Sequence, residues 1–360
     1  MTAVDPSRIS SSNDRLAPSG HQPSWAERIP AGYWVLGLLL LVMPAFAGDF
    51  VLFQVFGWTF ILGIIALSLM FLAGYGGMVS LAQMTVAGVS GYMVSIFGAS
   101  AIETISLAWP WYIAIPLALI IAMLFGTLVG WLAVRTEGIY TIMITLAIAA
   151  AFFFFTRQNY VIFNGFSGFN GVLPPDLFGV NWRGPVAFYY LTLFWATLAF
   201  LSVLYLARAP FGMTLQGIRD NPRRMAALGY NVTAHRVAAY TFAALLAGIG
   251  GILLTWQSAQ ISPGTAGIGP VIDVLVVAVI GGLRHPIGPF IGAFVYVILK
   301  TFAIDALVAI GISGERFNLL IGIGFLIIVF WSPDGLLGLW QKLRTARARD
   351  PLTGRETRAP

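Results

Sequence analysis

A long run of residues that is almost free of charge constrains this chain more than any other feature. Between Ala31 and Val134 the only charged residues are Asp49 and Glu103. Over the whole chain 9% of residues are charged and 58% are hydrophobic, whereas soluble domains carry about 25% charged residues. So little polar surface cannot keep a 360-residue globule in water. We therefore predict an all-α fold, a polytopic bundle of helices that cross a lipid bilayer.

About ten apolar runs approach the length that a membrane span needs, which is about 20 residues. The first run ends in Ala45-Phe46-Ala47, which resembles a signal-peptidase site. We favour an uncleaved first helix, because the polar region before it is unusually long; cleavage would leave nine spans. The predicted spans lie near 31–48, 50–73, 78–98, 110–133, 138–155, 187–207, 237–258, 271–283, 287–309 and 317–332. A disordered polar tail is expected at 1–30 and a basic tail at 341–360.

The positions of the basic residues predict the orientation of the spans. Loops on the cytoplasmic side of a membrane protein are enriched in Lys and Arg. With ten spans, Arg135, the loop 208–236, Arg284 and the C-terminal tail fall on one side. We therefore expect a multi-pass protein of the bacterial inner membrane with both termini cytoplasmic. The net charge of +6 is not read as nucleic-acid binding, because no folded basic domain is present.

Glycine and other small residues recur where helices are expected to pack or break. Helices in lipid associate through small residues four positions apart, and five such pairs occur in the predicted spans. They are Ala87/Gly91, Gly126/Gly130, Ala244/Gly248, Ala247/Gly251 and Gly288/Gly292. The clusters Gly74, Gly76, Gly77 and Gly281, Gly282 interrupt apolar runs at corresponding points of the two halves. Paired interruptions of this kind can mark a transport pathway.

The loop 208–236, predicted to be cytoplasmic, has the signature of a short helix. Asn221 suits the N-cap, Pro222 the first helical position and Gly229 the left-handed residue after the end. A helix this short is not stable alone, so it must lie against a surface. From the residues alone, a protein groove and the lipid headgroups that its arginines would attract are equally good candidates.

The loop 156–186 on the opposite side is rich in Gly, Asn, Phe and Pro. Loops longer than about 15 residues usually carry a function or are disordered, and the aromatic residues argue against disorder. We expect a cap over an outer vestibule, a docking surface for a partner, or a packed loop without a function of its own.

Several kinds of chemistry are not supported by the sequence. There is no cysteine, and the three histidines lie far apart, so no metal site is expected. Neither lysine, Lys300 or Lys342, stands in a phosphate-binding loop of the Gly-Lys-Ser/Thr type. No catalytic pair of acids is apparent, so an enzyme is not expected. The predicted helix interiors are almost free of charge, which favours a conduit for a neutral or zwitterionic solute that is driven from elsewhere.

Polar residues on two predicted spans could line such a conduit. Gln83 is the best candidate, because it is long, carries a donor and an acceptor, and follows a glycine break. Ordinary hydrogen bonding between helices would explain each of these residues equally well. The candidates are Ser80, Gln83, Thr85, Ser90, Thr141 and Thr145.

Four stretches together resemble the permease subunits of branched-chain amino acid ABC importers, of the LivM type in the LivH/LivM family. They are ALSLMFLAGYGGMVSLAQMTVAGVSGYM (66–93), PFGMTLQGIRDNPRRMAALGYNV (210–232), VIGGLRHPIGPFIGA (279–293) and SPDGLLG (332–338). The resemblance covers about residues 50–340. It implies that the predicted transmembrane domain, 31–340, is a permease and that solute moves by alternating access. It also implies separate ATPase subunits that bind ATP-Mg, a second permease chain and a periplasmic or extracellular substrate-binding protein, within a lipid bilayer.

The resemblance assigns two regions to partners. The short helix would dock in a groove of the ATPase, and the outer loop, with Gly168, Asn170 and Gly171, would face the binding protein. The coupling residues implied are Arg219, Asp220, Asn221, Pro222, Arg223, Arg224, Ala226, Ala227 and Gly229. Close packing and helix breaks are assigned to Gly74, Gly76, Gly77, Gly281, Gly282, Gly288 and Gly292.

Departures from the family pattern leave the solute open. Arg284-His285 stands where relatives commonly have Gly-Ser, Gln83 where a histidine is common, and Asp334 where a basic residue is frequent. The alternatives are a sugar-type ABC permease, a urea or amide ABC permease and, from another class, an ion-coupled secondary transporter.

Overall fold

The computed structural model describes residues 31–102, 104–136, 138–175, 179, 181–309, 335, 336 and 338. The chain divides into two units, Met1–Ala47 and Gly48–Pro360. The described part of the first unit consists of the helix α1 (Ala31–Val42) and the 3-10 turn η3 (Met43–Ala45). The second unit contains the other described elements and all the features discussed below.

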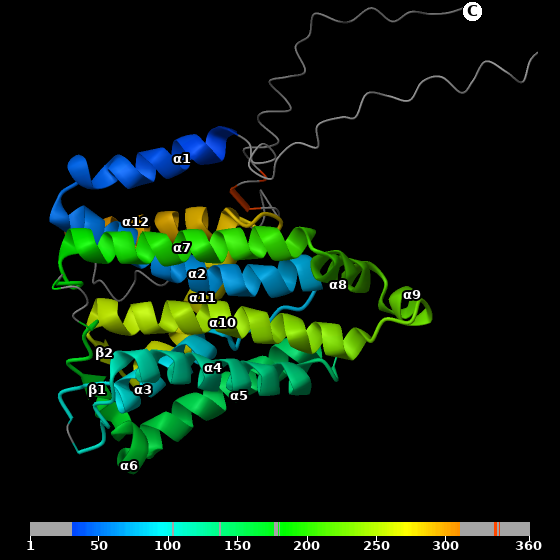
Figure 1. Ribbon diagram of the computed structural model, residues 1–360, viewed down its shortest axis with the longest axis horizontal. Coiled ribbons are helices and arrows are strands. Elements are labelled where there is room, and N and C mark those ends of the chain that lie inside the picture. Colours follow the sequence, from blue (N-terminus) through cyan, green and yellow to red (C-terminus); the bar gives the residue numbers. More distant parts are fainter. Residues whose placement is uncertain are drawn as a thin grey trace, which may run out of the picture. The chain divides into compact units, whose positions relative to one another are not determined.

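The second unit is a bundle of long helices (Figure 1), as the composition predicts. Its helices are η4 (Val51–Gly57), α2 (Trp58–Met70), η5 (Phe71–Tyr75), α3 (Gln83–Phe97), α4 (Trp111–Ala133), α5 (Ile139–Gln158), α6 (Tyr160–Phe163), η6 (Gly165–Ser167), α7 (Pro185–Arg208), α8 (Pro210–Asp220), α9 (Pro222–Ala227), α10 (Val232–Ser258), η7 (Pro263–Ala266), α11 (Ile268–Gly281) and α12 (Gly288–Ala309). The strands β1 (Phe169–Asn170) and β2 (Gln260–Ile261) pair antiparallel. The β pair lies at one end of the bundle and α9 at the other (Figure 1); we call these the β-pair end and the α9 end.

Five helices in the described part of the chain are long and apolar enough to cross a membrane. They are Val51–Tyr75, Trp111–Ala133, Ile139–Gln158, Pro185–Arg208 and Val232–Ser258. The continuous span predicted over 78–98 is wrong, because residues 77–82 are not helical and α3 begins at Gln83. Together with α11, α3 is shorter than a full span. The predicted span 317–332 lies outside the described residues, so the count of ten is not confirmed.

One continuous helix, Val51–Tyr75, forms the centre of the bundle and is almost wholly buried. It comprises η4, α2 and η5, and it packs against α7, α10, α11 and α12. The helices α4, α5 and α7 instead carry large exposed apolar side chains, such as Leu124, Met143 and Phe194. Apolar surface of this kind suits lipid or another transmembrane chain.

The small residues do bring helices into close contact, as the sequence predicts. A Cβ on Gly126 would collide with Ala244, and a Cβ on Gly251 would collide with the Ala87 carbonyl oxygen. Ser90 on α3 donates a hydrogen bond of 2.8 Å to the Gly248 carbonyl oxygen on α10. Because the backbones approach so closely, α10 packs tightly against both α3 and α4.

The two glycine clusters that interrupt the helices lie side by side. A Cβ on Gly74, at the end of η5, would collide with the Leu283 carbonyl oxygen in the turn between α11 and α12. Within that hairpin, Gly281 lies against the Gly288 carbonyl oxygen and Gly292 against that of Val277. At these glycines the backbones lie so close together that there is no room for a side chain.

Candidate functional site

Two helices, rather than one, form the segment that was predicted to dock on an ATPase. The first is α8, whose Gly212, Leu215 and Ile218 are buried. Spacing of three residues between buried positions is typical of an amphipathic helix. The sequence prediction missed α8, although Pro210 at its first position and this spacing indicate it. In addition, α10 begins at Val232, five residues before the predicted span.

The second helix, α9, is capped as the sequence predicts. The Asn221 side chain accepts a hydrogen bond of 2.9 Å from the Arg224 backbone N–H. Pro222 is the first helical residue, and Gly229 has a φ of +90°. Met225 packs on Gly217 of α8. The caps and this contact hold a helix that is too short to be stable by itself.

No residue of α9 is buried. Its arginines and its small residues Ala226 and Ala227 are all exposed, and Leu228 after its end is 66% exposed. The packing against α8 covers only one side of the helix, so the remaining sides are free to enter a groove. The basic residues on this surface are Arg223 and Arg224.

Arg219 joins this segment to the central helix. Its Nη1 donates a hydrogen bond of 2.6 Å to the Gly74 carbonyl oxygen in η5. Asp220 accepts from its Nε at 3.0 Å and forms an ion pair with its Nη2 at 2.9 Å. The stem of Arg219 crosses Gly77, where φ is +67° and a Cβ would meet the arginine Cγ. Gly77 is therefore required both for the turn and for the passage of Arg219.

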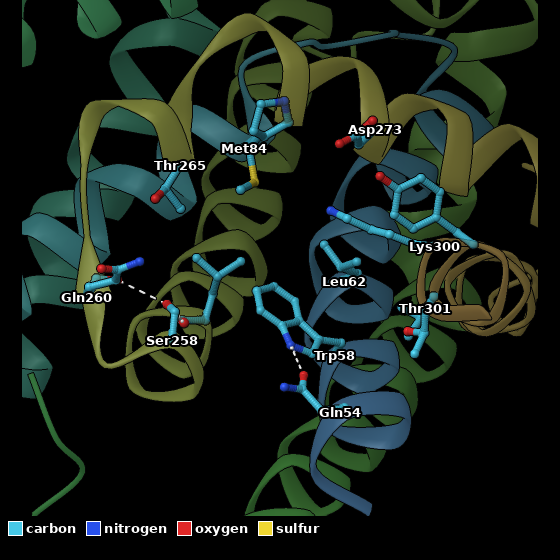
Figure 2. A pocket seen from close by; sticks show the side chains of 14 residues that line it. Gln54, Trp58, Leu62, Met84, Ser258, Gln260, Thr265, Asp273, Lys300 and Thr301 are labelled. Atoms are coloured by element: carbon cyan, nitrogen blue, oxygen red, sulfur yellow. Dashed lines mark hydrogen bonds between the residues drawn. The ribbon is translucent and has the colours of Figure 1, made fainter. Parts of the chain in front are cut away.

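A cavity of about 450 Å³ lies between the central helix and α3, α10, α11 and α12 (Figure 2). One part of its lining is apolar and includes Leu62, Met84 and Leu254. Trp58 also lines it and donates a hydrogen bond of 3.0 Å from Nε1 to Gln54 Oε1. The polar part includes Gln54, Ser258, Gln260, Thr265, Asp273 and Lys300.

None of the six residues predicted to line a path lies on this cavity. They are all buried, and most have structural partners. Thr145 Oγ1 accepts from the Leu81 backbone N–H at 3.1 Å, and Gln83 Oε1 accepts from Ser68 at 3.1 Å. Ser80 Oγ accepts from Ala82 N–H, Thr141 donates to the Thr136 carbonyl, and Ser90 bridges α3 and α10. Thr85 Oγ1 has no partner among the described residues.

Sequence reasoning missed the charged residues of the cavity. Asp273 and Lys300 fall within predicted spans, and a charge within a span is itself a signal of a functional site. The helix interiors are therefore less free of charge than predicted.

The loop 156–186 contains a defined structure at the β-pair end. Asn170 pairs with Gln260, a residue that lines the cavity. Its carbonyl oxygen also accepts a hydrogen bond of 2.9 Å from Ala101 N–H. Gly168 and Gly171 have φ values of +62° and +71°, and a Cβ on Gly168 would collide with the Ile261 carbonyl oxygen. These glycines allow the loop to reach β2 between α10 and α11.

The turn between α11 and α12 contains His285. Burial lowers the pKa of its imidazole and so favours the neutral form. In the described part of the chain, no group of three His, Asp or Glu side chains could hold a metal ion.

Comparison with known proteins identifies the family. The model for the permease component of branched-chain amino acid transport systems matches residues 51–329. The permease LivM of a high-affinity branched-chain amino acid transport system in Salmonella typhimurium is 25% identical over 79% of this chain and 68% of its own length. A probable LivM permease of Methanocaldococcus jannaschii is 26% identical over 61% of this chain and 67% of its own length.

A more distant relative is the ribose import permease RbsC of Haemophilus influenzae, 22% identical over 69% of this chain and 76% of its own length. No solved structure matches the chain. The family match covers the central helix, the α8–α9 segment and the cavity. This chain therefore belongs to the family of permease components of branched-chain amino acid transport systems, and it is a membrane-embedded permease subunit of an ABC importer.

Proposed function

We propose that this chain forms one half of the transmembrane path of an importer for branched-chain amino acids or related small zwitterionic or neutral solutes. A separate ATPase would bind ATP-Mg and dock on α9. The observation that carries this proposal is the geometry of α9: a capped helix with no buried residue that reaches the central helix through Arg219. Both termini would then be cytoplasmic, and the α9 end would face the cytoplasm.

The same contacts supply a route for mechanical coupling. Movement of a docked ATPase would shift α9 and α8 together, because Met225 packs on Gly217. Arg219 would transfer this shift to Gly74. From Gly74 the helix runs without interruption to Trp58 and Gln54, which line the cavity. A rigid helix of this kind can alternate the access of the cavity between the two sides of the membrane.

Two other partners are proposed. A second permease chain would cover the exposed apolar faces. The relatives of this chain carry two permease names, LivM and LivH, which supports a pair of permease chains. The probable LivH permease of Methanocaldococcus jannaschii is 30% identical over 39% of this chain and 45% of its own length. A substrate-binding protein would dock at the β-pair end, where the loop with Gly168 and Asn170 is ordered against β2.

Docking on α9 is tested with a charge placed on its exposed surface. Ala226→Glu should abolish co-purification of the ATPase from native membranes and lower ATP-driven uptake about tenfold or more, since a mismatched charge at an interface costs several kcal/mol. The matched control is Ala234→Glu, because Ala234 is an exposed residue in the first turn of α10. An acidic side chain is favourable at a helix N-terminus, so this variant should keep ATPase co-purification and uptake within about twofold of wild type.

Two results would contradict the proposal. One is an Ala226→Glu variant that retains its ATPase and its uptake. The other is wild-type uptake that collapses on addition of an ionophore while ATP remains, which indicates an ion-coupled transporter.

A further inference from the structure

Two side chains of opposite charge face the cavity without a direct ion pair between them, although their charges act on each other at longer range. Asp273 comes from α11 and Lys300 from α12, and both line the space (Figure 2). A direct ion pair does form elsewhere, between Arg219 and Asp220 in the α8–α9 segment. The Lys300 ammonium lies 5.7 Å from the centre of the Tyr296 ring, and the Tyr296 hydroxyl interacts with the Asp273 carboxylate.

Charges in this position need an explanation. Asp273 is half-buried and Lys300 is exposed, and both lie on apolar helices, where a charged side chain usually marks a pathway for a substrate or an ion. If the two charges served only the fold, a direct ion pair would satisfy them at the lowest cost. They instead approach the same space from two helices, as Figure 2 shows. A ligand that carries both signs of charge would satisfy them together.

The rest of the lining indicates the other part of that ligand. Trp58, Leu62, Met84 and Leu254 form the apolar part of the lining, which we call the apolar wall. Apolar surface with a few placed polar groups is typical of small-molecule sites, and the volume of about 450 Å³ lies within their usual range of about 300–1,000 Å³. The cavity can therefore take an apolar side chain together with two charged groups.

We propose that this cavity binds the zwitterion of an aliphatic α-amino acid during transport. Asp273, with the Tyr296 hydroxyl, receives the α-ammonium group, and Lys300 receives the α-carboxylate. The side chain of the ligand lies against Trp58, Leu62 and Met84. This inference rests on the proposed function, which it narrows: sugars, urea and amides lack the pair of opposite charges.

The place of the cavity fits delivery from the β-pair end. Gln260, Ser258 and Gln54 line it where α10 ends and η4 begins, and Gln260 pairs with Asn170 of the ordered loop. A solute released by a binding protein on that loop would meet these polar groups first. The charged residues and the apolar wall lie further along the same space.

The test uses the complex that co-purifies with the full chain, reconstituted in lipid nanodiscs without binding protein. Binding is measured for three probes: L-leucine, L-leucinamide, which lacks the carboxylate, and 4-methylpentanoate, which lacks the ammonium group. Wild-type complex should bind L-leucine about 30-fold or more tightly than either analogue, as expected for loss of one partner of a charge pair. This comparison needs no variant, so a failure to fold cannot obscure it.

Two variants then test which group of the ligand each charged side chain binds. Lys300→Gln should weaken L-leucine binding about 30-fold and bring it level with L-leucinamide, whose own affinity should not change. Asp273→Asn should bring L-leucine level with 4-methylpentanoate. Asp49→Asn, the same change at an exposed residue outside this cavity, should alter none of the three affinities.

Equal binding of the three probes by wild type, or variants that bind L-leucine like wild type, would overturn this inference. ATP-driven uptake of some other solute by the same complex, in sealed proteoliposomes supplied with its binding protein, would then leave the proposed function standing. Absence of any ATP-driven uptake in those proteoliposomes would instead contradict the proposed function itself.

Discussion

The central helix is π-helical at both ends, and the two ends have different partners. At the β-pair end, the Phe53 carbonyl oxygen in η4 accepts a hydrogen bond of 2.8 Å from the Gln257 side chain of α10. At the α9 end, the Gly74 carbonyl oxygen in η5 accepts one of 2.6 Å from Arg219. π-Helical turns within α-helices are rare and often lie at functional sites.

The exposure of the two donors separates their roles. Gln257 is 5% exposed and belongs to a helix packed on the core, so it can only fix η4 in place. The Arg219 side chain is 40% exposed and belongs to the α8–α9 segment, where a partner protein can move it. We propose that the contact at η4 is fixed inside the bundle and that the contact at η5 is the one through which force enters.

The largest effect is expected from closing the space at the α9 end. In Gly74→Ala the new Cβ would collide with the Leu283 carbonyl oxygen, and overpacking of this kind destabilises by about 1–3 kcal/mol. The thermal unfolding midpoint in detergent should fall by several degrees, and uptake should be lost. Gly269→Ala is the control, because nothing lies within 4 Å of its Cβ. Equal midpoints for the two variants would argue against a tight contact here.

A second change removes the moving contact without disturbing the core. Arg219→Ala deletes the bond to Gly74 and the ion pair with Asp220, which are partly exposed, so stability should change by less than about 1 kcal/mol. ATP-driven uptake should nevertheless fall about tenfold, because the contact that couples the α8–α9 segment to the central helix is lost. ATPase activity and co-purification should persist. Loss of uptake and ATPase together would show that Arg219 serves assembly rather than coupling.

The opposite pattern is expected at η4. Gln257→Leu removes the donor to Phe53 at a cost of about 1 kcal/mol in stability. The loss of stability is limited because the substitution also removes Gln257 Oε1, a buried oxygen with no hydrogen-bond partner among the described residues. The ratio of solute transported to ATP hydrolysed should stay at the wild-type value. A fall in that ratio as large as in Arg219→Ala would remove the distinction between the two ends.

The smallest effect is expected from the cap of α9. Asn221→Ala removes the bond to Arg224 N–H and should destabilise this helix by about 0.5–1 kcal/mol. Amide hydrogen exchange in α9 should accelerate about threefold, while exchange in the helices of the core stays unchanged. Asn231→Ala removes the same kind of cap from α10, a helix of 27 residues, where a smaller acceleration is expected because packing holds it.

The features that the sequence predicts best are those with local causes. Asn221, Pro222 and Gly229 specify the limits of α9 through interactions a few residues apart, and the small residues of α10 specify close contacts through their size. The fold class follows from the lack of charge. Each of these inferences needs no knowledge of which helices are neighbours.

The cavity could not be predicted in the same way, because its lining comes from helices far apart in the sequence. Gln83 and Thr145 have the chemistry of path residues, yet their neighbours Ser68 and Leu81 use that chemistry in the core. Asp273 and Lys300 could be noticed as charges within apolar runs, but not as facing each other across one space. The sequence also could not show that the third helix begins only at Gln83, because residues 77–82 are as apolar as the helix that follows.

The most direct test of the account is whether movement at α9 reaches the cavity through Arg219. The chain has no cysteine, so spin labels can be attached at Phe50→Cys and Gln260→Cys. Both residues are exposed at the β-pair end. The complex is prepared with partners that lack accessible cysteines. Electron–electron resonance would measure the distance between the labels with and without ATP-Mg. We predict that ATP-Mg shifts the distance distribution with Arg219 in place and leaves it unchanged in Arg219→Ala, although the ATPase remains bound. The same shift in both proteins would contradict the account.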